Sequence, residues 1–159
     1  RIVFATDYFA SALIDSSSNS LLRRFMEAGG EVVILGFNFC FLKQVPDGFT
    51  LNSFKTVGEI LNIDFQFDDI RAFKGAYPNT ITDAGNKLSL SRFTIVGAQS
   101  SVRQSEVNVV YATNELGEAT SWTKFYNNGG KFTQLWMDEF HHPEKMFEVI
   151  WKLMEQTPG

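Results

Sequence analysis

The chain has 159 residues, of which 44% are hydrophobic and 20% charged, and its formal net charge is −4. This composition is typical of a globular protein, and the length suits one domain spanning 1–159, either alone or as part of a larger protein. An acidic chain without a basic run argues against a nucleic-acid partner, and no apolar stretch approaches the ~20 residues of a membrane span.

The first third of the chain predicts a strand, a helix and a second strand. Residues 2–5 form a short apolar run, and Ser16, Ser17 and Ser18 are candidates for the cap of a helix that follows. Gly29 and Gly30 favour the end of that helix. Residues 32–35 are continuously apolar, which is the pattern of a strand covered on both faces.

The middle of the chain predicts shorter elements. Helices are expected at 54–61 and 82–88, the second weakened by Gly85, and strands at 63–67, 93–96 and 106–113. The strand at 63–67 alternates apolar and polar side chains, which indicates an edge or half-exposed position.

The last third predicts a hairpin and a helix. Residues 119–126 and 131–137 are strands joined by Asn127-Asn128-Gly129-Gly130, and both residue types tolerate the positive φ of a tight turn. Pro143 suits the first position of a helix that runs to about Gln156. Its apolar face comprises Met146, Val149, Ile150, Leu153 and Met154.

These elements predict an α/β fold, a three-layer sandwich. Its central sheet is expected to be mostly parallel, built from strands near Ile2, Val32, Phe93 and Val107, with helices on both faces and the antiparallel hairpin at one edge. Ligands of such sheets bind beyond the carboxyl ends of the strands.

Two segments resemble class I glutamine amidotransferase-like domains, which have a flavodoxin-like fold. The run LLRRFMEAGGEVVILG is similar to their helix–GG–strand unit, which leads to the nucleophile elbow. In catalytic members an FHPE-like segment supplies the His and Glu of a Cys-His-Glu triad. Here His142, Pro143 and Glu144 match that segment, with His141 as one extra residue.

The elbow departs from the family pattern. Catalytic members carry G-x-C-x-G, whereas this chain reads Gly36-Phe37-Asn38-Phe39-Cys40. Asn38 stands at the nucleophile position and cannot replace a thiolate in acyl transfer. Cys40 stands at the second glycine, between Phe39 and Phe41, and such a cysteine is more often a small buried hydrophobe.

The chain therefore resembles the non-catalytic amidotransferase-like domains appended to glycoside hydrolases and other large extracytoplasmic proteins. The resemblance implies a binding or structural module without a cofactor or metal. Its partners would be other domains of the same polypeptide or further copies in a homo-oligomer. An extracytoplasmic location is favoured by the resemblance alone.

Several alternatives stay open. The chain could be a hydrolase or amidotransferase that uses Cys40 with His142 and Glu144, although these last two also suit a helix cap. A small-molecule pocket could form at the strand ends from Asp7, Asn38, Gln99, Ser100 and His142, with Asp138 and His141 as further candidates. Asp138, Glu139, His141, His142 and Glu144 could bind a metal, but adjacent histidines rarely converge on one ion, which favours a solvated loop. Trp122 and Trp136 could stack on a sugar, and core packing is the simpler expectation.

Overall fold

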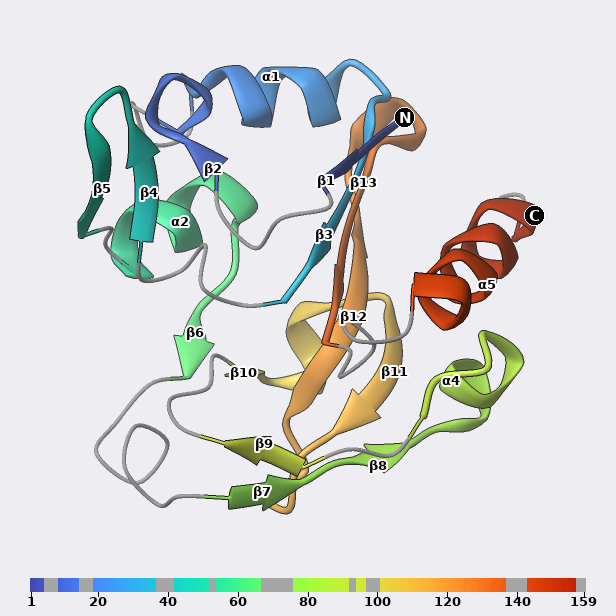
Figure 1. Cartoon of the computed structure of the whole chain (residues 1–159). Helices are drawn as coiled ribbons and strands as arrows, with labels where there is room; N and C mark the ends of the chain where they lie inside the picture. The colour runs from blue at the N-terminus through green and yellow to red at the C-terminus, as the bar shows by residue number, and fades with distance from the viewer. Residues whose placement is uncertain are drawn as a thin grey trace.

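The computed structural model describes residues 1–4, 9–14, 19–36, 42–51, 54–66, 76–91, 94–96, 101–136 and 143–156. Figure 1 shows a twisted sheet with short helices around it. The helices are α1 (Leu21–Glu27), α2 (Phe54–Leu61), α4 (Asp83–Lys87) and α5 (Pro143–Glu155). The strands are β1 (Ile2–Phe4), β2 (Phe9–Ala10), β3 (Glu31–Leu35), β4 (Leu42–Val45), β5 (Gly48–Leu51), β6 (Phe65–Gln66), β7 (Ala76–Pro78), β8 (Thr80–Ile81), β9 (Thr94–Val96), β10 (Ser101–Val102), β11 (Val109–Thr113), β12 (Ala119–Phe125) and β13 (Lys131–Leu135).

The main sheet has eight strands and mixed directions. Its order is β1-β3-β13-β12-β10-β6, and β11 pairs with both β12 and β8. Among the described strands of this sheet, only β1–β3 and β3–β13 are parallel pairs. The other five pairs are antiparallel. Two small sheets, β2-β4-β5 and β7-β9, lie apart from it.

The predicted three-layer sandwich on a mostly parallel sheet is therefore wrong. The expected parallel strand near Phe93 is β9, which pairs antiparallel with β7 in a separate sheet, and the strand near Val107 is β11, which runs antiparallel to β12. In the described part of the chain, four short helices replace the expected helix layers. A continuous apolar run indicates that a strand is buried on both faces, but it does not indicate the direction of the neighbouring strands. The pattern therefore could not distinguish a mostly parallel sheet from a mixed one.

The predicted hairpin exists but occupies the centre of the sheet instead of an edge. Strands β12 and β13 are antiparallel, with Thr123 opposite Thr133 and Phe125 opposite Lys131. Asn128 adopts a φ of 55° in the connecting turn. The other side of β13 pairs in parallel with β3, which places the hairpin between the parallel and antiparallel halves of the sheet.

Other local predictions are confirmed. Strand β3 is interior, and its residues 32–35 are buried on both faces. Helix α5 begins at Pro143 and ends at Glu155, close to the expected bounds. The expected cap of α1 is wrong: the cap is Ser20, whose side chain accepts a hydrogen bond from the Arg23 N–H at 3.2 Å, and not one of residues 16–18, which lie outside the described residues.

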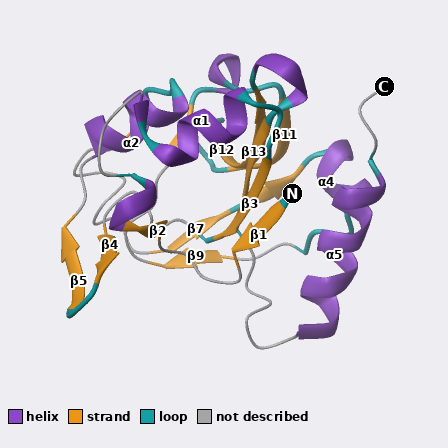
Figure 2. Ribbon diagram, turned by 90° about the horizontal axis from the view of Figure 1, so that it is seen from above, coloured by secondary structure: helices purple, strands orange, loops and turns teal. Residues whose placement is uncertain are grey.

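Two hydrophobic clusters lie on opposite faces of the sheet. One joins α1 and α2 to side chains such as Val32, Ile34 and Phe132. The other joins α5 and the end of α4 to the alternate side chains, such as Val33 and Leu135. Figures 1 and 2 accordingly show α5 across the sheet from α1 and α2. None of the described helices is long and apolar enough to cross a membrane.

Candidate functional site

The site residues expected from the sequence fall mostly outside the described part of the chain. These are Asp7, Asn38, Cys40, Gln99, Ser100, Asp138, His141 and His142. Glu144 is described: it lies in the first turn of α5, is exposed, and borders an apolar groove instead of a polar pocket. The alternative triad of Cys40, His142 and Glu144 and the predicted loss of the nucleophile at Asn38 thus both stay hypotheses, because Asn38, Cys40 and His142 lie outside the described residues.

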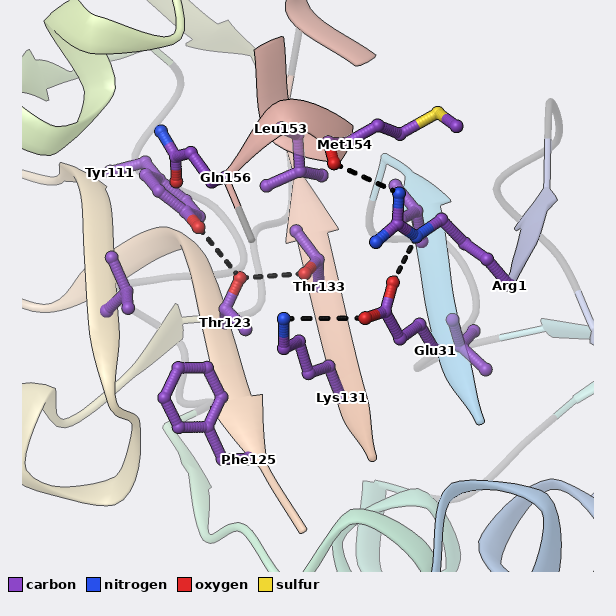
Figure 3. A pocket seen from close by; sticks show the side chains of 13 residues that line it. Arg1, Glu31, Tyr111, Thr123, Phe125, Lys131, Thr133, Leu153, Met154 and Gln156 are labelled. Carbon is purple, nitrogen blue, oxygen red and sulfur yellow. Dashed lines mark hydrogen bonds and ion pairs between the residues drawn. The ribbon is translucent and has the colours of Figure 1, made fainter. Parts of the chain in front are cut away.

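A different site is present under α5, on the sheet face that the helix covers (Figure 3). Successive side chains of a strand point to opposite faces, so residues two apart share a face. Four neighbouring strands each contribute such a pair to this cavity: Glu31 and Val33, Lys131 and Thr133, Thr123 and Phe125, Val109 and Tyr111. We call it the sheet–α5 cavity; its volume is about 200 Å³.

A row of hydroxyl groups crosses the floor of the sheet–α5 cavity. Thr123 and Thr133 are directly opposite each other on β12 and β13, and their Oγ1 atoms are 2.7 Å apart. The Tyr111 hydroxyl lies 3.0 Å from the same Thr123 oxygen. All three residues are buried, so each hydroxyl depends on the others for a hydrogen-bond partner.

A row of charges lies beside the hydroxyls. Lys131 is opposite Glu31, with Nζ 3.4 Å from Oε1, and the Arg1 guanidinium donates to the other carboxylate oxygen. On its other side Lys131 lies over the Phe125 ring, 5.8 Å from the centroid. Two cations therefore flank one carboxylate, and the Lys131 side chain is only 15% exposed.

These surroundings change two pKa values. The hydrogen bond from Arg1 lowers the pKa of Glu31 below its ordinary value of 4.5; the charges of Lys131 and Arg1 assist, and burial partly opposes them. Burial raises the pKa of Tyr111 above 10.0, against the opposing effect of its hydrogen bond with Thr123. At neutral pH the carboxylate is thus ionised and the phenol keeps its proton.

The roof of the cavity comes from the end of α5. Leu153, Met154 and Gln156 line it, and the Arg1 guanidinium donates to the Met154 carbonyl at 3.3 Å (Figure 3). Val109 and Leu153 add apolar surface to the lining, whereas Lys131 and Arg1 add positive charge. A cavity with this polarity can hold a small amphiphilic molecule.

No pattern in the sequence singled out the residues of this cavity. Thr123 and Thr133 occur as polar side chains within strands, which is equally consistent with a solvent-facing row. The available signal was the hairpin itself, because a turn at 127–130 fixes the register that places Thr123 opposite Thr133. The neighbour of Lys131 on β3 could not be inferred, since no local pattern specifies it.

A second surface feature lies between α5 and the edge strand β1. Phe147 and Trp151 are 67% and 64% exposed, and with Val3 and Met154 they border an apolar groove. We call these four residues the α5–β1 surface. The expected apolar face of α5 is only partly correct, because Val149 is buried, Ile150 partly so, and Met154 exposed.

The tryptophans expected in the hairpin region are buried. Trp122 is inaccessible and packs on Phe132, with ring centroids 5.6 Å apart, so it is a core residue and not a sugar-stacking one. Trp136 is also buried. Among the described residues, no group of three or more histidine, cysteine or acidic side chains could hold a metal ion. No known family model matches the sequence, and no curated protein is significantly similar to it.

Proposed function

We propose that this chain is a binding module that associates with a second copy of itself through the α5–β1 surface. The observation that carries this proposal is the exposure of Phe147 and Trp151 beside an edge strand. Contiguous exposed apolar patches mark interaction sites, whereas single exposed apolar residues are common and need no explanation.

The aromatic residues form a defined stripe on α5. Phe147 and Trp151 are four residues apart, and Met154 follows three residues later, which places all three on one side of the helix. The core of the protein uses the adjacent side, through Met146, Val149 and Ile150. The apolar arc of α5 is therefore wider than the protein's own sheet can cover.

Strand β1 supplies the second half of the surface. Among the described residues β1 pairs only with β3, so its outer edge offers backbone N–H and C=O groups to another strand. Such an edge is self-complementary: a two-fold axis beside it pairs β1 antiparallel with its own copy. That arrangement brings each Val3 and its neighbouring α5 stripe towards the partner's stripe.

The charges around the groove suit this symmetric contact. Glu148 and Lys152 of α5 border the groove, and Arg1 lies close to its β1 end. A rim with both signs can pair with its own two-fold copy without a net repulsion. The proposal keeps the class of binding module that the resemblance to non-catalytic amidotransferase-like domains implies, including a homo-oligomeric partner.

The test is the oligomeric state of the chain as a function of concentration, measured by sedimentation velocity or light scattering. The wild-type chain should form a dimer, and Phe147→Glu with Trp151→Glu should remain monomeric. Leu116→Glu is the matched control, because Leu116 is an exposed apolar residue in the turn between β11 and β12. It should leave the dimer unchanged.

Two results would overturn the proposal. One is a wild-type chain that stays monomeric up to about 1 mM, where even weak association populates a dimer. The other is a dimer that survives both glutamate substitutions. Circular dichroism on each variant shows whether the fold is retained, which is expected because Phe147 and Trp151 lie outside the core.

A further inference from the structure

We propose that the sheet–α5 cavity binds a small organic monoanion, a free carboxylate that carries a compact apolar or aromatic body. The cavity shares Met154 with the α5–β1 surface but opens onto the sheet beneath α5, and its ligand goes beyond the proposed self-association. It is carried by the two rows of polar side chains across the sheet and by the apolar side chains that line the same cavity.

The charge balance of the cavity favours one negative charge. Arg1 and Lys131 contribute two cations, and Glu31 neutralises one of them. Charges in a partly enclosed site are costly unless they are paired, so a ligand with one negative charge completes the balance. A dianion would leave an excess negative charge next to Glu31.

The Lys131 ammonium group has N–H donors available for such a ligand. An ammonium group carries three N–H donors, and Lys131 makes an ion pair with Glu31 at 3.4 Å. Its cross-strand neighbour on the other side is Phe125, whose ring accepts no conventional hydrogen bond. The remaining N–H groups are available to the oxygens of a carboxylate, which form short, charge-assisted hydrogen bonds.

The hydroxyl row supplies a further donor. Tyr111, Thr123 and Thr133 carry one O–H each, and their two mutual hydrogen bonds use two of the three hydrogens. When Tyr111 donates to Thr123 and Thr123 to Thr133, the Thr133 hydrogen is left for an acceptor in the cavity. Thr133 and Lys131 are two residues apart on β13 and so face the same side.

The remaining lining of the cavity suits an apolar body. Val109, Phe125 and Leu153 contribute hydrocarbon surface to it. The volume of about 200 Å³ exceeds the ~150 Å³ of an apolar cavity that holds benzene. A benzoate-sized molecule therefore fits, with its carboxylate at Lys131 and its ring against the apolar side chains of the lining.

The experiment uses three probes at constant ionic strength, with binding followed by calorimetry or by NMR. Benzoate has both the charge and the ring, benzamide has the ring without the charge, and acetate has the charge without the ring. Benzoate should bind at least about tenfold more tightly than either, a difference of ~1.4 kcal/mol. Equal binding of benzamide or of acetate would overturn the proposal, as would no detectable binding of benzoate.

Substitutions of Lys131 test whether benzoate binds in the sheet–α5 cavity. Lys131→Met should weaken benzoate binding at least about tenfold, and Lys131→Arg should retain most of it. Lys87→Met, at an exposed lysine of α4, is the matched control. Unchanged binding by a folded Lys131→Met variant would contradict the assignment. Lys131 does not border the α5–β1 groove. The benzoate experiment and the oligomerisation experiment can therefore contradict their two proposals independently of each other.

Discussion

Thr123 and Thr133 share a hydrogen bond of 2.7 Å between side chains that are almost completely buried in the middle of the sheet. The bond links the two strands of the hairpin, and Tyr111 extends it to a third strand. Buried hydroxyls cost free energy unless they are paired, so each member of this row stabilises the others.

Replacing Thr123 by Val should lower the free energy of unfolding by ~1–3 kcal/mol, because it leaves the Tyr111 hydroxyl without a partner in a buried site. Urea titration measures the change. Thr113→Val is the control, since Thr113 is a half-buried threonine of β11 in the same sheet, and its effect should stay within ~0.5 kcal/mol. Equal losses in the two variants would show that the row contributes nothing specific.

The free energy of unfolding should depend on pH in the acidic range because of Glu31. Its folded pKa lies below 4.5, so the ionised carboxylate stabilises the fold above the unfolded pKa. This contribution is lost as the pH falls from about 4.5 through the lower folded value. Unfolding by urea at several pH values should show wild type more stable than Glu31→Gln at pH 7, with the difference shrinking towards low pH. A difference that is constant with pH would show that ionisation of Glu31 does not stabilise the fold.

Gly85→Ala should destabilise the protein although alanine is the better helix former by ~1 kcal/mol. A Cβ at this position of α4 would lie 2.1 Å from the Tyr111 carbonyl oxygen, which belongs to the backbone of β11. Helix and strand would have to separate, at a cost of ~1–3 kcal/mol. Asn86→Ala, at the next and exposed position, should be neutral or stabilising. A stabilised Gly85→Ala variant in thermal unfolding would show that α4 can move away from β11.

Substitutions along α5 should separate its two apolar sides. Val149 is inaccessible, and Val149→Ala should cost ~2–3 kcal/mol. Ile150 is only partly buried, so Ile150→Ala should fall short of the ~2–5 kcal/mol of a fully buried isoleucine. Phe147→Ala should change stability by less than ~0.5 kcal/mol, since the ring is exposed. The comparison is made by denaturant unfolding at a protein concentration where each variant is monomeric, and a large loss for Phe147→Ala would place its ring in the core.

Local chemistry predicted the local elements. The turn Asn127-Asn128-Gly129-Gly130 specified a hairpin, and Pro143 specified the start of α5, because both effects act within a few residues. The apolar run of β3 correctly predicted burial on both faces.

The arrangement of the sheet was not predictable in the same way. The direction of the strands beside β3 depends on which distant segment pairs with it, and no periodicity in 32–35 encodes that partner. The sheet–α5 cavity depends on this unknown pairing, because Glu31 and Lys131 meet only when β13 lies beside β3. The exposed side of α5 was missed for another reason: Phe147 and Trp151 continue the apolar arc of the core residues, and sequence alone cannot show where the protein's own surface ends.

The central position of β13 also has a consequence for folding kinetics. Its contact with β12 closes a short loop, since Thr123 and Thr133 are ten residues apart, and hairpins of this kind form in about 1–10 μs. Its contact with β3 joins Glu31 to Lys131, roughly a hundred residues apart, and such non-local pairing is slow because loop closure is opposed by chain entropy. We therefore expect the hairpin to form early and the parallel strands β3 and β1 to join it in the rate-limiting step. Destabilising substitutions in the 127–130 turn should then slow folding, with φ-values at least as high as those in β3.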